Sequence, residues 1–227
     1  MSDYIHKEHP KTVGKTEFWK QIKRTVNGEE VSEKDIAQIV SQIQKHLGLA
    51  KTDYLLDFGC GNGALASRIF PSVDRYLGVD FSEYLLGIAK EYFQPSEKIE
   101  YYLSDIMSFL DEKFAEVHPQ KILIYGVMSY LNKAEAADLF SSLAKKNSLE
   151  RVFIGNIPNR KFADDFFQQR SVENYDLDDA KSAIGVWWNT EEICDMAKDA
   201  GFTPQIFFMS DDFYGSDYRF DLVLEKT

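Results

Sequence analysis

The chain has 227 residues, of which 44% are hydrophobic, and this length and composition suit one α/β domain with an appendage. Its formal net charge is −11 and it has no block rich in lysine and arginine, which argues against nucleic acid as a partner and favours a small substrate that is neutral or cationic. The two cysteines lack metal-ligand spacing, no apolar run is long enough to cross a membrane, and no leader segment is visible, so we expect a cytoplasmic protein without a metal site.

Residues 1–50 are predicted to form a helical N-terminal cap. The segment TEFWKQIKRTV has a helical spacing of apolar residues that places Phe18 and Trp19 near one face. The segment VSEKDIAQIVSQIQKHLGL predicts a second helix, because Ser32 is a suitable N-cap, apolar residues then recur every three or four positions, and Gly48 provides a stop.

From residue 52 onward, predicted strands alternate with predicted helices. The strands are expected at 53–58, 75–81, 98–105, 121–127, 151–157, 204–210 and 218–226, and the helices at 63–70, 82–93, 133–146 and 190–202. Only the segment DDFYGSD separates the last two strands, so they must form a hairpin and the last strand must be antiparallel to its neighbour. We therefore predict that residues 51–227 form a Rossmann-like α/β domain with a seven-stranded, mostly parallel sheet.

The stretch DFGCGNGA, residues 57–64, places three glycines at alternate positions between a predicted strand and a predicted helix. Glycines allow a ligand to approach the backbone and the start of a helix offers free N–H groups, so this turn predicts a ligand site. The stretch also matches the dinucleotide pattern through Gly59, Gly61 and Ala64. Asp57 favours a different ligand, because a carboxylate there repels a pyrophosphate and suits an ammonium group. A tight turn without any ligand is the remaining alternative.

Two further acids end the next two predicted strands. An acid at Asp80 can accept hydrogen bonds from both hydroxyls of a ribose, or it can cap the helix that begins near Ser82. Asp105 can accept a hydrogen bond from an adenine amino group, or it can be an ordinary loop residue. Because the carboxyl ends of parallel strands meet at one edge of a sheet, Asp57, Asp80 and Asp105 are expected to face one crevice.

These motifs resemble those of class I S-adenosylmethionine-dependent methyltransferases. The stretches LLDFGCGNGALA, YLGVDFS, YLSDI and ILIYGVMSYL carry the likeness, which covers about residues 52–227. The resemblance implies S-adenosylmethionine as methyl donor, S-adenosylhomocysteine as product, and the following donor-binding residues: Asp57 near the ammonium group, Gly59, Cys60, Gly61, Asn62 and Gly63 in the turn, Asp80 on the ribose, Phe81 and Ile106 on the adenine faces, Asp105 on the adenine amino group, and Tyr125 and Gly126 beside the sulfonium.

The sequence departs from the pattern of many relatives in two places. The segment KKNSLERVFI stands where many of them have a Leu-Lys-Pro-Gly-Gly turn before the fifth strand. The segment YGVMSY stands where methyltransferases of base amines or glutamine side chains have Asn-Pro-Pro followed by Tyr or Phe. The second departure argues against those acceptors.

The acceptor side is predicted from an aromatic-rich segment. Residues 158–188 follow the fifth predicted strand at the same sheet edge as the donor crevice, and a loop of this length is usually functional when it is ordered. The predicted acceptor-binding residues are Phe18, Trp19, Tyr130, Trp187 and Trp188. Alternatively, these rings pack a lid or a contact between subunits.

The function predicted from the sequence is methyl transfer to an oxygen or nitrogen of a small molecule, by a monomer or homodimer. The candidates for a general base are His6 and His9, because an N-terminal appendage can close over the donor site in such folds, although a solvated tail is the alternative. A non-catalytic module that binds the donor or its product for regulation or scaffolding remains a second hypothesis. A nicotinamide enzyme is disfavoured by Asp57 and by the terminal hairpin.

Overall fold

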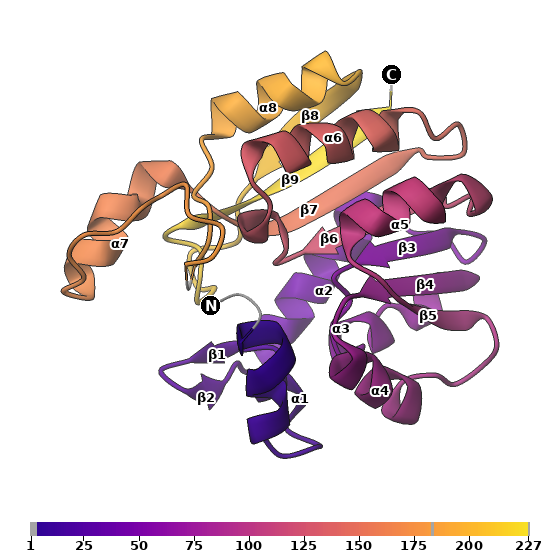
Figure 1. Ribbon diagram of the computed structural model, residues 1–227, viewed down its shortest axis with the longest axis horizontal. Coiled ribbons are helices and arrows are strands. Elements are labelled where there is room, and N and C mark those ends of the chain that lie inside the picture. The colour runs from indigo at the N-terminus through magenta and orange to yellow at the C-terminus, as the bar shows by residue number, and fades with distance from the viewer. Residues whose placement is uncertain (1–3, 183, 227) are drawn as a thin grey trace.

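The computed structural model describes residues 4–182 and 184–226, and its centre is a seven-stranded sheet with the order β5-β4-β3-β6-β7-β9-β8 (Figure 1). Strands β3 to β7 pair in parallel, and β9 lies between β7 and β8, antiparallel to both. The predicted Rossmann-like sheet with an antiparallel last strand is therefore confirmed. The strands are β3 (Tyr54–Phe58), β4 (Arg75–Asp80), β5 (Ile99–Leu103), β6 (Lys121–Tyr125), β7 (Arg151–Pro158), β8 (Phe202–Phe207) and β9 (Arg219–Lys226).

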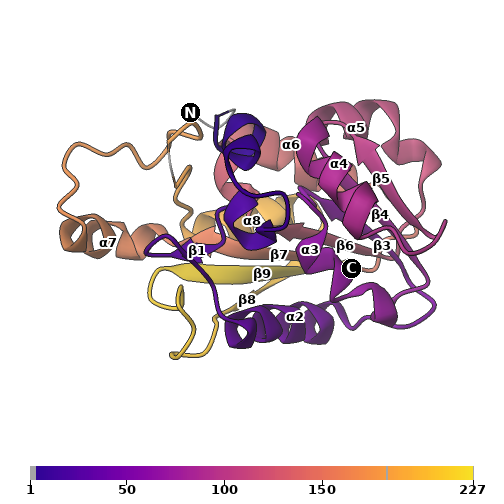
Figure 2. The ribbon, with the colours of Figure 1, turned by 90° about the horizontal axis from the view of Figure 1, so that it is seen from below.

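Helices cover both faces of the sheet. One face carries α2 (Glu33–Leu47), α3 (Ala64–Ser67) and α4 (Glu83–Tyr92), and the other carries α5 (Ile106–Glu112), α6 (Lys133–Ala144) and α8 (Thr190–Asp199). Figure 2 shows α2 extending along its side of the sheet beside β8 and β9. None of the described helices is both long and apolar enough to span a membrane.

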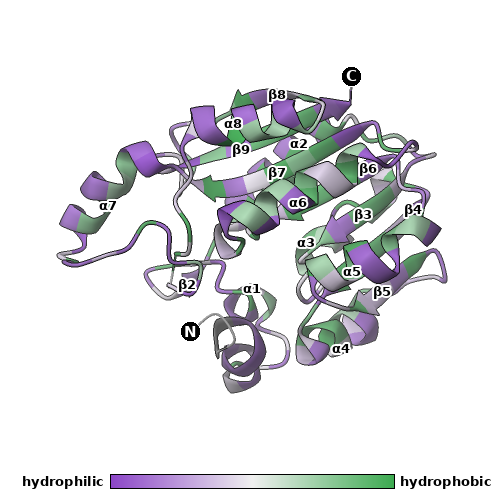
Figure 3. Cartoon of the chain, turned by 45° about the horizontal axis from the view of Figure 1, so that its top comes forward, coloured by the Kyte–Doolittle hydropathy of each residue, from purple (hydrophilic) through white to green (hydrophobic). Residues whose placement is uncertain are grey.

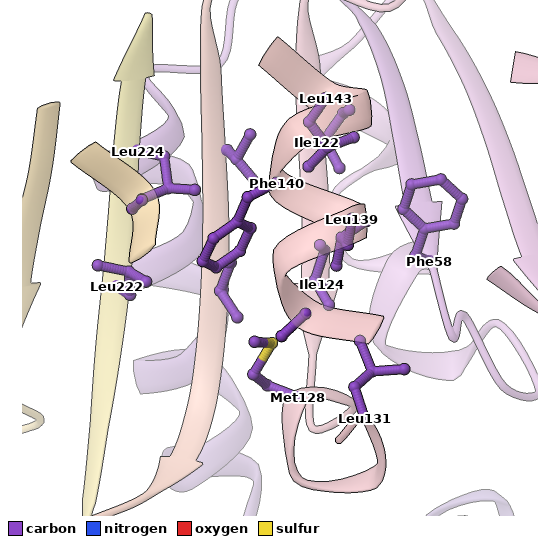
Figure 4. Packing of buried hydrophobic residues seen from close by; sticks show 14 of the residues in the cluster. Phe58, Ile122, Ile124, Met128, Leu131, Leu139, Phe140, Leu143, Leu222 and Leu224 are labelled. Atoms are coloured by element: carbon purple, nitrogen blue, oxygen red, sulfur yellow. The ribbon is translucent and has the colours of Figure 1, made fainter. Parts of the chain in front are cut away.

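The alternation of side chains along the strands explains the two layers. On β6, Ile122 and Ile124 pack toward α6, whereas Leu123 and Tyr125 belong to the cluster that contains α2. Figure 4 shows Ile122 and Ile124 beside Phe140 and its neighbours on α6. Figure 3 shows that β6 and β7 are largely hydrophobic along their length, which is typical of strands buried on both faces.

Helix α2 begins and ends where the sequence predicts. The side chains and backbones of Ser32 and Asp35 form a reciprocal capping box, and Gly48 ends the helix in a left-handed conformation. Its buried residues pack against β6 and β7, so this part of the predicted N-terminal cap lies on the sheet. The boundary at residue 50 stays a prediction, and the first three residues of the cap lie outside the described ones.

The helix expected in TEFWKQIKRTV is mostly wrong. Only α1 (Phe18–Gln21) is helical, and the chain then forms a short hairpin of β1 (Thr25–Val26) and β2 (Glu29–Glu30). Asn27 and Gly28 both take positive φ angles at its turn, as a two-residue hairpin connection requires. The Asn-Gly pair was the signal for this hairpin, and the apolar spacing of the segment concealed it.

The remaining helical segments connect these elements. Residues Tyr4–Glu8 and His9–Thr12 form short helical turns that lie against α4, so this part of the chain is not a solvated tail. The N-cap of α8 is Asn189, whose side chain accepts a hydrogen bond from the Glu191 N–H. Glu192, on the first turn of α8, forms an ion pair with Lys133 at 2.6 Å.

Candidate active site

A cleft of about 730 Å³ opens where β3, β4 and β6 end, within the size range of small-molecule sites. Ten of the twelve predicted donor-binding residues line it: Asp57, Gly59, Cys60, Gly61, Asp80, Phe81, Asp105, Ile106, Tyr125 and Gly126. The topology therefore brings the three strand-end acids to one crevice, as expected. Their roles toward a ligand stay predictions.

The glycine turn is held tightly beside the cleft. Gly59 donates its N–H to the carbonyl of Val79 at 2.8 Å and takes a φ of +74°. A Cβ at Gly59 would lie 2.2 Å from Cγ2 of Val127, so no side chain fits there without movement of the turn. Because Gly59 has no side chain and lines the cleft, a ligand can contact its backbone there.

Asp80 connects this turn to the following helix. Its Oδ2 accepts a hydrogen bond from the Gly61 N–H and its Oδ1 accepts one from the Ser82 N–H, each at 2.8 Å. Ser82, and not Asp80, is the N-cap of α4. Burial raises the pKa of Asp80, although these backbone N–H groups act in the opposite direction. Each carboxylate oxygen retains acceptor capacity for a ligand hydroxyl at the cleft.

Asp57 is the most perturbed acid of the cleft. Its side chain is buried, and its Oδ2 accepts a hydrogen bond from the Tyr76 hydroxyl at 2.7 Å. Burial raises the pKa of Asp57 to about 7, and the negative charge of Asp80 contributes to this rise. The hydrogen bond from the Tyr76 hydroxyl and the positive charge of Arg24 oppose the rise. A cation placed in the cleft beside Asp57 would offset the cost of burying its charge.

Arg24 is a cleft residue that sequence reasoning missed. It enters from the hairpin of the N-terminal segment, and its guanidinium lies 4.7 Å from the centre of the Tyr125 ring. Its Nε and Nη1 are buried and have no hydrogen-bond partner among the described residues. Nothing local in the sequence distinguishes Arg24 from a surface arginine, because only the tertiary structure places it beside Tyr125.

Two predicted donor-binding residues do not line the cleft. Asn62 is fully buried, and its Nδ2 donates to the carbonyl of Phe18 at 2.8 Å and to Oε1 of Gln21 at 2.9 Å. Gly63 packs instead against the Tyr101 hydroxyl, where a Cβ would lie at 2.7 Å. Asn62 therefore anchors α1 to the glycine turn, and it connects the N-terminal segment to the cleft indirectly.

The two predicted acceptor residues of the N-terminal segment also point elsewhere. The Phe18 ring packs edge-on against Phe93, with 4.8 Å between ring centres, and Trp19 is buried in the core beside α2. Neither residue lines the cleft. Their apolar surface is used to attach the segment to the domain.

The tryptophans of the segment 158–188 are likewise part of the protein interior. Trp187 is buried against Phe166 of α7 (Ala163–Gln169), with 5.1 Å between ring centres. Trp188 is buried in the main core and donates its indole N–H to the carbonyl of Met128 at 3.2 Å. The prediction that these rings line an acceptor pocket is wrong, because Trp187 belongs to the small core beside α7 and Trp188 to the main core.

Tyr130 and His6 do line the cleft. Their ring centres lie 4.6 Å apart, and the His6 ring also lies 5.9 Å from that of Phe81. His9 does not reach the cleft, since its Nε2 lies 3.1 Å from the carbonyl oxygen of Lys20. Of the two candidate bases, only His6 is therefore placed to contact a ligand.

Comparison with known proteins identifies the domain around this cleft. A family model described as "Methyltransferase domain" matches residues 55–146. An uncharacterised methyltransferase of Schizosaccharomyces pombe is 32% identical over 69 residues, which cover 28% of this chain and 26% of that protein. The chain thus spans about a quarter of the length of this curated relative.

Solved structures show the same fold over most of the chain. Magnesium protoporphyrin IX methyltransferase from Synechocystis, crystallised with S-adenosylhomocysteine, superposes with a TM-score of 0.60 at 17% identity over 86% of this chain and 82% of its own. The N-methyltransferase NodS from Bradyrhizobium japonicum superposes with a TM-score of 0.62 at 13% identity over 86% and 98%. Residues 55–146 thus match a methyltransferase domain, and most of the chain has the same fold as these solved methyltransferases.

Proposed function

We propose that the protein binds S-adenosylmethionine in this cleft and transfers its methyl group to an oxygen or nitrogen of a small molecule. The observation that carries the proposal is the buried pair Asp57 and Asp80 on either side of the glycine turn. A buried carboxylate with a raised pKa is costly to keep unless a ligand uses it. S-adenosylmethionine offers a partner to both carboxylates, its ammonium group to Asp57 and its ribose hydroxyls to Asp80.

Arg24 is placed to bind the carboxylate of the same donor, whose ammonium is assigned to Asp57. An α-amino acid carries its ammonium and carboxylate on one carbon, so a residue that binds the carboxylate must lie close to the residue that binds the ammonium. Arg24 attracts Asp57 electrostatically and has two buried nitrogens without a partner among the described residues. We assign the donor's carboxylate to Arg24, which makes the N-terminal segment part of the donor site.

Methyl transfer from a sulfonium requires the protein mainly to position the donor and the acceptor. When bound, the donor supplies a methyl group that is already activated on a sulfonium. The side chains of the cleft then orient the donor and exclude water, and proximity accounts for much of the acceleration. Tyr125, at the end of β6, forms the wall on which the methyl-bearing end would rest. His6 is the residue placed to accept a proton from an acceptor that must lose one.

Two measurements test the proposal. Titration calorimetry with S-adenosylhomocysteine, S-adenosylmethionine and NAD should give binding of the two adenosyl compounds and not of NAD. Labelled S-adenosylmethionine with a mixture of small oxygen and nitrogen acceptors should then give a labelled, extractable product. Binding of NAD alone would overturn the proposal. Binding of the adenosyl compounds without transfer to any acceptor would favour the non-catalytic binding module.

A further inference from the structure

The carboxylates that line the cleft are already engaged on its donor side. Asp57 and Asp80, on β3 and β4, are assigned to the donor, and Asp105 is the N-cap of α5, where its carboxylate accepts hydrogen bonds from the Ser108 N–H at 2.9 Å and the Ser108 hydroxyl at 2.7 Å. Glu135 accepts a hydrogen bond at 2.8 Å from the backbone N–H of Asn132, in the capping box of α6. Among the described residues of the cleft, no acid remains for a cationic acceptor.

The cleft also contains an arginine that forms no direct ion pair with a described acid. Arg219, at the start of β9, lines the cleft and forms no ion pair with any described residue. The ion-paired arginines of the chain are Arg68, Arg75, Arg151 and Arg160. Arg24 and Arg170 also form no ion pair with a described residue, so Arg219 is informative because it lines the cleft and not because it lacks an ion pair.

The fold holds Arg219 in place without a direct ion pair; burial raises the pKa of the Asp221 carboxyl to about 6, and the charge of Arg219 opposes that rise. Its Nη1 donates to the carbonyl oxygen of Asn156 at 2.7 Å, and its guanidinium lies 4.8 Å from the centre of the Tyr218 ring. This is the one hydrogen bond of its guanidinium to a described residue, so four of its five N–H donors are left over. A planar fork of free donors matches the two oxygens of a carboxylate.

An irregularity in β7 creates this arrangement. The register against β9 shifts between Ile154 and Ile157, and Asn156 takes a φ of +66° inside the irregular stretch. Asp221 stabilises that conformation, because its Oδ1 accepts a hydrogen bond from the Asn156 N–H at 2.8 Å. Bulges of this kind re-aim groups next to functional sites, and this one presents a carbonyl to Arg219.

The other walls on this side are apolar or aromatic. Tyr130, Tyr218 and Ile184 line the cleft together with Arg219. Burial raises the pKa of the Tyr130 hydroxyl, and the charge of Arg219, which lines the same cleft, opposes that rise. Flat rings beside one fixed cation suit a molecule that combines a planar or apolar body with a single negative group.

We propose that the methyl acceptor is a small aromatic or apolar carboxylate whose carboxylate is bound by Arg219. This inference rests on the proposed function and names the acceptor class of the same site. It replaces the expectation, drawn from the net charge of the chain, that the substrate is neutral or cationic. Net charge averages over the whole surface, whereas recognition depends on the few groups that line the cleft.

The test compares matched probes on the protein loaded with S-adenosylhomocysteine. The probes are benzoate and phenylacetate, their neutral amides, and phenethylammonium, and binding is measured by ligand-observed NMR and calorimetry. The acids are expected to bind about 10- to 100-fold more tightly than the amides, and the ammonium compound should not bind. Arg219→Gln should abolish the preference for the acids and leave affinity for S-adenosylhomocysteine within about twofold of wild type.

Arg170→Gln is the matched control. Arg170 also lies over an aromatic ring, that of Phe166 at 3.7 Å, and also donates to one backbone carbonyl, but it does not line the cleft. The control should keep the preference for the acids, and Arg219→Lys should keep part of it. Acids that bind no better than their amides, or an Arg219→Gln protein that keeps the preference, would overturn the inference. Failure of the wild type to bind S-adenosylhomocysteine would instead overturn the proposed function.

Discussion

Replacing Asp57 with asparagine should stabilise the free protein at alkaline pH while weakening its binding of the donor. Burial raises the pKa of Asp57 from 3.8 to about 7. Each pH unit of that shift corresponds to ~1.4 kcal/mol, so the ionised carboxylate costs the folded state roughly 4 kcal/mol. Asparagine has a similar shape and can still accept the hydrogen bond from Tyr76, and it carries no charge.

The sign of the effect follows from proton uptake on folding. The folded state holds the proton of Asp57 up to about pH 7, whereas the unfolded state releases it near pH 4. The favourable contribution of the protonated group is therefore complete below about pH 4 and is lost as the pH rises through 7. Asp57→Asn should gain up to roughly 4 kcal/mol in free energy of unfolding at pH 8 and almost nothing at pH 4.

Urea unfolding of both proteins at pH 4 and pH 8, without ligand, measures this gain. The corresponding rise in melting temperature at pH 8 is roughly 8–16 °C for a domain of this size. Calorimetry at pH 8 should show a loss of about 10- to 100-fold in affinity for S-adenosylhomocysteine, because the ammonium loses its charged partner. Equal stability of the two proteins at pH 8 would refute the account of the buried charge, and unchanged affinity would refute the assignment of the ammonium to Asp57.

Three further substitutions examine the rest of the donor site. Asp80→Ala should weaken binding of S-adenosylhomocysteine by about 1–3 kcal/mol in calorimetry, and an unchanged dissociation constant would exclude a role for Asp80 on the ribose. Arg24→Gln should weaken binding of S-adenosylhomocysteine at least about tenfold without affecting methylthioadenosine, which lacks the amino-acid end; equal losses for both ligands would mean that Arg24 acts only on structure. Gly59→Ala should lower the melting temperature and abolish donor binding, because its Cβ would lie 2.2 Å from Val127 Cγ2 at a φ of +74°. A Gly59→Ala protein that folds and binds like wild type would show that the turn adapts.

Sequence patterns alone were sufficient for the features that depend on neighbouring residues. The alternation of strands and helices, the short connection before β9, and the cap at Ser32 each follow from spacing that a few residues define. The meeting of Asp57 and Asp80 at one cleft was also predictable, because both lie near the carboxyl ends of neighbouring parallel strands.

The acceptor side was decided by contacts between residues distant in the chain. The rings of Trp187 and Trp188 gave a misleading signal, because the sequence shows that a segment is aromatic but not whether its rings face a cavity or a core. Arg24 and Arg219 come from the N-terminal hairpin and the last strand, nearly two hundred residues apart, and meet the same cleft only in the folded chain. Local physics thus determined the elements and the glycine turn, whereas tertiary packing determined which charges line the cleft.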